Sequence, residues 1–336
     1  MNLIYYNDTI NIINLILEII NIFTIIIPIL LAVALLTLLE RKVLGYTQYR
    51  KGPNLIGPLG ILQPIADGLK LFIKENFKPS TANPFIFYIS PPIFFFIAIL
   101  LWGVTPIYNS GLNLNLSLLF IIALSSLSIY PLLTAGWSSN SKYALLGAIR
   151  GAAQMISYEV SFSLILLPII FIVGSWNLNL FINFNQLNPW LIIPCPLLFI
   201  MWFISTLAET NRSPFDLAEG ESELVSGYNV EYSGAPFALF FIGEYSNIIF
   251  INLITTILFF GGGFNTNNIL LNITNISIKT SLLIFSFLWI RTSFPRIRYD
   301  QLMMLIWKNF LPLILGLLNL YYILIIISGN FPSYYN

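Results

Sequence analysis

The chain has 336 residues, of which 57% are hydrophobic and only 9% are charged. About a quarter of the residues in soluble domains are charged, so this composition excludes an ordinary water-soluble protein. The 15 basic and 14 acidic residues nearly balance, which gives no indication of a nucleic-acid partner. The chain has no histidine and one cysteine, Cys195, so it cannot by itself hold a four-cysteine iron–sulfur cluster, a His-ligated haem or a His-based zinc ion.

Eight apolar stretches predict helices that cross a bilayer. A hydrocarbon core about 30 Å thick needs about 20 apolar residues per helix. Barrel strands would alternate in polarity and these stretches do not, so helices are expected. The expected spans are 10–39, 86–106, 116–137, 143–173, 190–208, 237–260, 278–294 and 311–328. The sequence therefore predicts an all-α membrane protein of about eight transmembrane helices, with residues 1–336 forming a single polytopic domain.

The basic residues predict the orientation in the membrane. All but two of them lie in connections that follow odd-numbered spans or at the ends of those spans, and so on one side. The exceptions are Lys279 and Arg150, which lies inside the fourth span. Basic loops mark the cytoplasmic or matrix side, so both termini are expected on the opposite side.

Two segments on the basic side are longer than simple connections. In the first, at about 40–80, apolar residues recur at helical spacing from Leu62 to Ile73, while Asp67, Lys70 and Lys74 share another face. This pattern predicts an amphipathic interfacial helix after the first span. The second segment, at about 208–235, carries six acids against one arginine.

The acidic segment has two interpretations. Asp216, Glu219 and Glu223 would share one face of a short helix, and acidic runs are most often solvated surfaces. Apolar residues such as Phe215 and Leu217 nevertheless give the segment anchors. An excess of acid is also not what orientation requires of a loop on this side.

Charged residues within the fourth span are candidates for function, because each costs about 2.5–3.5 kcal/mol to insert. Arg150 and Glu159 are about two and a half turns apart, on opposite faces of the helix, so they cannot pair with each other. We expect Glu159 to face other carboxyls, such as Glu209 or Glu244. A structural ion pair between helices is the alternative.

Other residues of the bundle form two further patterns. Glu40, Asp67, Glu209 and Glu244 would step from the inner surface into the bundle, as a proton or cation path requires, although an acid such as Glu40 alone could simply sit at the interface. Phe237, Phe241 and Tyr245 recur every four residues. Such an aromatic stripe more often serves packing or lipid contact than a ligand.

Four segments together resemble a known family, subunit 1 of NADH:ubiquinone oxidoreductase (respiratory complex I) of the mitochondrially encoded type. They are ERKVLGYTQYRKGPNLIGPLGILQPIADGLKLFIKE, GAIRGAAQMISYEVSF, AETNRSPFDLAEGESELVSGYNVEY and WIRTSFPRIRYDQLMMLIWKNFLP, and the likeness spans roughly residues 15–325.

The resemblance implies an eight-helix membrane subunit that forms much of a quinone tunnel and the start of a carboxylate path coupling quinone reduction to proton translocation. The implied tunnel residues are Arg41, Arg50, Phe237, Phe241, Tyr245, Arg291 and Arg296. The implied proton-path residues are Glu40, Asp67, Glu159, Glu209, Asp216, Glu219, Glu221, Glu223 and Glu244. Residues with an expected structural or coupling role are Arg150, Tyr158 and Arg212.

The same resemblance implies the partners, cofactors and location. Ubiquinone would be the substrate, and the NADH, FMN and iron–sulfur clusters would be held by other complex I subunits, with no metal or redox centre in this chain. The expected location is the mitochondrial inner membrane, with the basic loops on the matrix side; a bacterial plasma membrane is the alternative location. Alternative functions are the membrane anchor of a related ion-pumping hydrogenase complex, a stand-alone secondary transporter and a passive membrane anchor.

Overall fold

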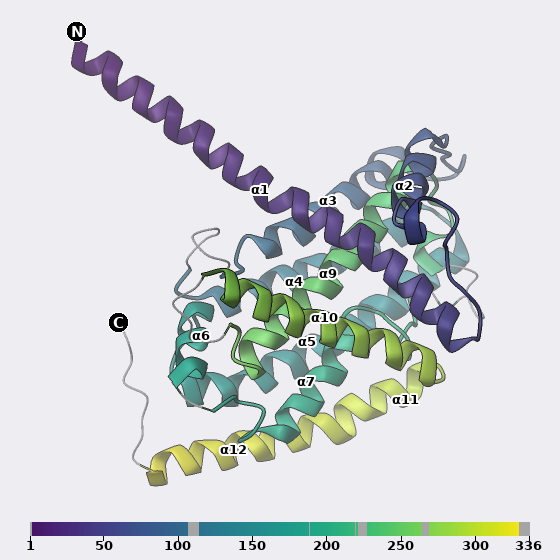
Figure 1. The fold of residues 1–336 in the computed structure, drawn as a ribbon. Coiled ribbons are helices and arrows are strands. Elements are labelled where there is room, and N and C mark those ends of the chain that lie inside the picture. The colour runs from purple at the N-terminus through teal and green to yellow at the C-terminus, as the bar shows by residue number, and fades with distance from the viewer. Residues whose placement is uncertain are drawn as a thin grey trace.

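The computed structural model describes residues 2–106, 114–187, 189–218, 220, 227–263 and 269–328 (Figure 1). These residues form helices and connections, with no strand among them. The long helices are α1 (Asn2–Thr47), α3 (Pro84–Trp102), α4 (Ser117–Ser138), α5 (Lys142–Val173), α9 (Ala235–Phe259), α10 (Ile269–Ser293) and α12 (Leu311–Ser328). Shorter elements are η1 (Pro58–Gly60), α2 (Gln63–Ile73), α6 (Leu178–Leu187), α7 (Pro196–Glu209), η2 (Gly227–Asn229), α11 (Tyr299–Met304) and η3 (Leu305–Phe310).

Seven helical stretches among the described residues are long and apolar enough to cross a membrane. The eighth expected span, 190–208, is helical only over the 14 residues of α7. Its helix begins at Pro196 because a residue that precedes proline is driven out of the helical conformation, and Cys195 is indeed non-helical. A helix of this length covers about 21 Å, less than the hydrocarbon core. The all-α fold with about eight spans and an interfacial helix is confirmed.

Three helices begin several residues before the spans that hydropathy predicts. The first is α1, which was expected from residue 10 and begins at Asn2. The seventh span was expected from residue 278, whereas α10 begins at Ile269. Its polar first turns remain helical because the hydroxyls of Thr274 and Ser277 donate to carbonyls of the preceding turn. The last span was expected from residue 311, but helix extends back through a π-helical turn, η3, to Tyr299.

The surface helix α2 confirms the predicted amphipathic pattern. Its polar side is tied to α1, since Arg41 donates to Asp67 at 2.5 Å. Within α2, Gln63 donates to the same carboxylate at 3.0 Å. Its apolar residues face outward, with Leu69 57% and Phe72 60% exposed. An apolar face turned away from the protein is the arrangement of a helix that lies in a membrane interface.

Small residues bring the central helices close together. α4 packs against α5, where a Cβ on Gly136 would lie only 2.3 Å from the Cβ of Ala148. On the same helix, Gly147 lies against the backbone of Gly227 in η2. Membrane helices associate through such close packing, because lipid provides no hydrophobic drive between them. The later part of the acidic segment is thereby fixed on α5.

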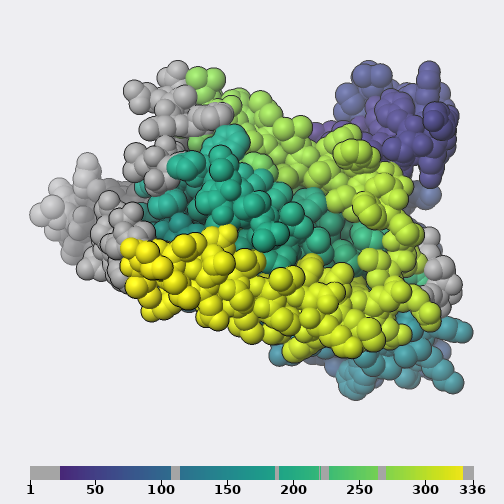
Figure 2. Space-filling view, turned by 90° about the horizontal axis from the view of Figure 1, so that it is seen from below, coloured from purple at the N-terminus to yellow at the C-terminus, as the bar shows by residue number. Residues whose placement is uncertain are grey.

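The outer helices place the chain ends on one side of the bundle. Figure 1 shows the start of α1 and the end of α12 on the left, and α2 with α11 on the right. α12 lies across one face of the molecule and contacts α5 (Figure 2). The arrangement of ends is that expected from an even number of crossings.

Candidate functional site

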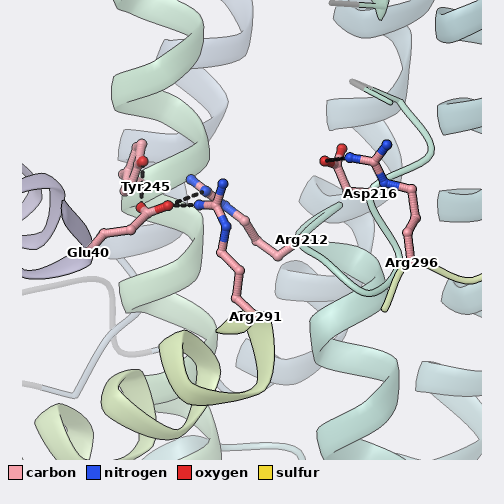
Figure 3. Close-up of polar contacts among 6 residues, drawn as sticks. All are labelled: Glu40, Arg212, Asp216, Tyr245, Arg291 and Arg296. Atoms are coloured by element: carbon pink, nitrogen blue, oxygen red, sulfur yellow. Dashed lines mark hydrogen bonds and ion pairs between the residues drawn. The ribbon is translucent and has the colours of Figure 1, made fainter. Parts of the chain in front are cut away.

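A buried carboxylate on α1 connects three separate parts of the chain (Figure 3). Glu40 is 5% exposed and accepts a 2.6 Å hydrogen bond from the phenol of Tyr245 on α9. Its other oxygen accepts from Arg212, which follows α7, at 3.3 Å and forms an ion pair with Arg291 of α10. A buried charge is tolerated where ion partners and hydrogen bonds satisfy it, and this one has both. These four residues are called the Glu40 cluster below.

The Glu40 cluster carries more positive than negative charge. Two guanidinium groups face one carboxylate, and the guanidinium carbon of Arg212 also lies 4.3 Å from the centre of the Tyr245 ring. This cation–π contact stabilises the arginine against the aromatic face. The cluster therefore offers cationic donors to an acceptor that approaches it.

A small cavity of about 20 Å³ opens beside the Glu40 cluster. Its apolar lining is Leu36, Ile248, Ile284, Phe287 and Leu288, and its polar lining is the four cluster residues. The space suits about one water molecule. Anything larger that passes here must move side chains aside.

The predicted aromatic stripe on α9 leads to the same cluster. The rings of Phe237 and Phe241 lie 4.4 Å apart between centroids, and those of Phe241 and Tyr245 lie 6.3 Å apart at 26°. Phe237 and Phe241 are partly exposed, whereas Tyr245 is buried. The stripe thus forms a continuous aromatic row that ends at Glu40.

A second ion pair holds the acidic loop to the segment after α10 (Figure 3). Arg296 donates to Asp216 at 3.1 Å, and the two side chains are 31% and 17% exposed. The amide of Ile297 also donates to the carbonyl of Pro214 at 3.0 Å. The loop and the α10–α11 connection are therefore fixed to each other.

Glu159 and Glu209 lie close enough for their charges to interact. That Glu159 faces Glu209 stays a prediction, which this electrostatic proximity supports. Oε2 of Glu209 is buried and has no hydrogen-bond partner among the described residues. The Tyr158 hydroxyl, on a fully buried side chain next to Glu159, also lacks such a partner there. Orphan polar atoms of this kind are positions where buried water completes the hydrogen bonding.

A further carboxylate of the bundle, that of Glu244 on α9, accepts a hydrogen bond from Tyr228 of η2. It lies within electrostatic range of Arg212 and Asp216. Tyr228 was not among the residues predicted from the sequence. Its place at the end of the acidic segment is a weak signal, because only the packing of η2 on α5 brings it to Glu244.

Gln154 of α5 is a second residue that the sequence did not single out for a site. It is fully buried, and its amide nitrogen donates to the carbonyls of Ala208 and Phe215, both at 2.8 Å. One side chain thus fixes both ends of the segment that carries Glu209 and Arg212. Gln154 lies four residues from both Arg150 and Tyr158, on the same face of the helix, and this spacing could have indicated a role.

The other predicted residues are not part of the Glu40 cluster. Arg41 pairs with Asp67 on α2, and Arg50 donates to Gln48 at 3.0 Å in the exposed loop that follows α1. Arg150 is half-buried on α5. Glu219, Glu221 and Glu223 lie outside the described residues, and so does most of the short helix expected through them.

Among the described residues no three His, Cys, Asp or Glu side chains are placed to share a metal ion. The carboxylates are instead distributed through the bundle, and each has a tyrosine, an arginine or another carboxylate near it. Such groups can exchange protons, and the aromatic row beside them offers an apolar surface.

Comparison with known proteins identifies the family. The family model described as NADH dehydrogenase matches residues 20–322. The protein named NADH-ubiquinone oxidoreductase chain 1 of Paracentrotus lividus is 59% identical over 87% of this chain and 90% of its own length. Proteins of the same name from Carassius auratus and Balaenoptera physalus are 57% and 55% identical, over 89% and 93% of this chain and 92% and 98% of their own lengths. The chain therefore belongs to the NADH dehydrogenase family.

Proposed function

We propose that the chain is a membrane subunit of the proton-pumping NADH:ubiquinone oxidoreductase that forms the quinone tunnel and the first part of a carboxylate proton path. The names of its relatives support the enzyme, and their animal sources support a multi-pass protein of the mitochondrial inner membrane. The basic loops, including Arg41 and Arg50, would face the matrix.

The observation that carries the tunnel proposal is that the aromatic row on α9 ends at the Glu40 cluster. An isoprenoid tail needs an apolar, largely preformed passage with few polar groups, and Phe237 and Phe241 provide such a surface. A quinone head is neutral and carries only acceptor oxygens. The arginines and tyrosine of the cluster are donors that such a head could meet in transit.

The small cavity beside the cluster adds a mechanical requirement. It has room for about one water molecule, so passage of a quinone head requires lining side chains to move, and Arg212 and Arg291 are two of them. Both arginines are bound to Glu40. The charge state of Glu40 would therefore control how readily the passage opens, which couples the tunnel to a proton.

The proton path would begin at the same cluster. Arg212 bonds to Glu40 and lies within electrostatic range of Glu244, so it interacts with both of these carboxylates. Glu159 and Glu209 lie within electrostatic range of each other. Two carboxyls that share a site cannot both ionise easily, so one of such a pair tends to hold a proton. Among the described residues the Glu209 oxygen Oε2 and the Tyr158 hydroxyl lack a hydrogen-bond partner, so a buried water could bind at each of them. Asp67 and Asp216 would lie at the surface end of the path.

The chemistry of electron transfer belongs to the partners. NADH, FMN, the iron–sulfur clusters and the quinone headgroup site would be held by other subunits of the complex, while ubiquinone is the substrate that passes through this chain. No histidine is available here as an iron ligand, and the one cysteine, Cys195, is buried.

The test of the proposed function is Arg291→Met in the assembled complex. This change removes one cationic donor of the cluster and keeps the apolar stem of the side chain. We expect NADH:ubiquinone reduction to fall while electron transfer from NADH to an artificial acceptor at the flavin is retained. Unchanged quinone reduction with Arg291→Met would contradict a tunnel at this position.

A further inference from the structure

The segment that follows α2 is fastened to the start of α9. The side-chain oxygen of Asn76 accepts from the amide of Ala235 at 3.2 Å, and the amide of Phe77 donates to the hydroxyl of Ser233 at 2.9 Å. The same hydroxyl donates to the carbonyl of Glu75 at 3.4 Å. Figure 1 shows α2 beside the green start of α9, which it contacts.

Asn76 supplies a cap that the sequence next to α9 cannot supply. The first amides of a helix have no partner within it, and a side chain at the cap position usually accepts from them. The cap position of α9 is Gly234, which has no side chain. Asn76, from a distant part of the chain, provides the missing oxygen.

Gly234 is required for this contact. Its φ of 64° lies in the left-handed region, and a Cβ there would lie 2.5 Å from the Asn76 oxygen and 2.9 Å from the carbonyl of Lys74. Only glycine fits both the backbone conformation and the close approach. The two segments are therefore shaped to each other.

The attachment of α2 to α9 bears on the Glu40 cluster, because both helices are connected to it. Near its middle α2 is tied to α1 through the ion pair of Asp67 with Arg41, the residue that follows Glu40. α9 carries the aromatic row and Tyr245, which bonds to Glu40. The helix α2 is thus a strut between the two helices that meet at the cluster, and Asn76 is its attachment to α9.

We propose that Asn76 is a positioning residue for quinone reduction, which caps α9 from the end of α2 and so fixes the aromatic row relative to Glu40. The proposal rests on the proposed tunnel. The effect of Asn76 on the binding and passage of quinone would be indirect, because among the described contacts Asn76 touches neither the Glu40 cluster nor the aromatic row.

The experiment compares Asn76→Ala with Asn76→Asp in the assembled complex, with Glu75→Ala as a matched truncation of the neighbouring exposed residue. Two quantities are measured: the apparent KM and kcat for ubiquinone, and amide hydrogen exchange at the start of α9. A lost cap weakens a helix start by about 1 kcal/mol, which corresponds to a factor of about five. We expect Asn76→Ala to raise KM and to speed exchange of the Ala235 amide by about that factor, with kcat within about twofold.

Asn76→Asp keeps the accepting oxygen and should restore both quantities, and Glu75→Ala should change neither. Unchanged exchange in Asn76→Ala would show that Asn76 is not a cap and would overturn the proposal. Faster exchange with an unchanged KM, or a KM that Asn76→Asp fails to restore, would equally overturn it. If Asn76→Ala does not assemble, Asn76→Ser gives the same comparison with a shorter side chain.

The failure of the tunnel itself is recognised separately. If Arg291→Met leaves quinone reduction intact, the proposed function is wrong whatever Asn76 does. If Arg291→Met impairs it and Asn76→Ala does not, only the positioning role is wrong.

Lys279→Met provides a control at the opposite end of α9, where Lys279 donates to the carbonyls of Phe260 and Gly262. It should change stability without altering the KM.

Discussion

Tyr245 on α9 donates a 2.6 Å hydrogen bond to Glu40, which lies near the inner end of α1. The bond joins an aromatic row to a carboxylate that two arginines also hold. Each part alone has an ordinary explanation, as packing or as an interfacial acid. Their meeting at a buried point near the basic side of the bundle is what favours a tunnel coupled to a charge.

The contributions of the Glu40 cluster to stability can be separated by mutation. Tyr245→Phe removes one hydrogen bond and should destabilise by about 0.5–1.5 kcal/mol. Glu40→Gln leaves two arginines without their carboxylate. It should lower the free energy of unfolding by more than Tyr245→Phe does, up to about 3 kcal/mol, since breaking a buried ion pair leaves a buried charge without its partner. The partial exposure of Arg291, at 33%, reduces this effect. Thermal inactivation of the assembled complex measures both. A Glu40→Gln complex as stable as Tyr245→Phe would contradict the ion-pair account.

The aromatic row predicts a selective loss of quinone activity. Phe241→Glu places a charge on the apolar surface that the tail would follow, so quinone reduction should fall at least about tenfold. Phe241→Leu keeps an apolar side chain and should retain most activity. NADH oxidation by an artificial acceptor at the flavin is the control. Loss of both activities in Phe241→Glu would indicate misassembly and would not support a tunnel residue.

The sequence predicted which segments are helical more accurately than it predicted the residues at which the helices begin. Hydropathy located the spans, but it could not show that the chain turns before Pro196, because the residues of that turn are as apolar as a helix, with Leu191 and Cys195 buried. It also missed the polar start of α10, where Ser and Thr hydroxyls bond within the helix. Hydropathy measures transfer of side chains and contains no term for such bonds.

The site was predictable as a set of residues and not as a set of contacts. Helix geometry could exclude Arg150 as the partner of Glu159, because the two residues lie on opposite faces of the helix, but it could not choose among the other carboxyls. The pairing of Glu40 with Arg291 depends on how α1 and α10 pack, and no local pattern encodes it. Tyr228 and Gln154 were missed for the same reason, since their partners lie on other elements.

The orientation of the chain gives a prediction that needs no assay of activity. Cys195 is fully buried, so cysteines introduced elsewhere can be labelled selectively. Lys51→Cys and Glu231→Cys should react from the matrix side, and Leu270→Cys, near the start of α10, should react from the other side. Labelling of Lys51→Cys and Glu231→Cys from opposite sides would overturn the topology and the proposed function with it.

The proton path predicts that Glu159 must be able to ionise. Glu159→Gln should assemble but impair quinone-linked turnover and proton pumping, because the amide cannot release a proton. Glu159→Asp keeps a titratable group and should retain more activity than Glu159→Gln. NADH:quinone activity and proton uptake in membranes, with assembly confirmed, are the measurements. If Glu159→Gln equals the unsubstituted complex in both, Glu159 is structural and the path runs through other acids.

The most direct test is a structure of the assembled complex with ubiquinone bound. The account predicts density for the isoprenoid tail along Phe237 and Phe241, reaching the Glu40 cluster, with Arg212 or Arg291 displaced to open the small cavity. A bound quinone that leaves the aromatic row and the cluster untouched, with the cavity closed as it is here, would contradict the central claim that this chain forms the tunnel.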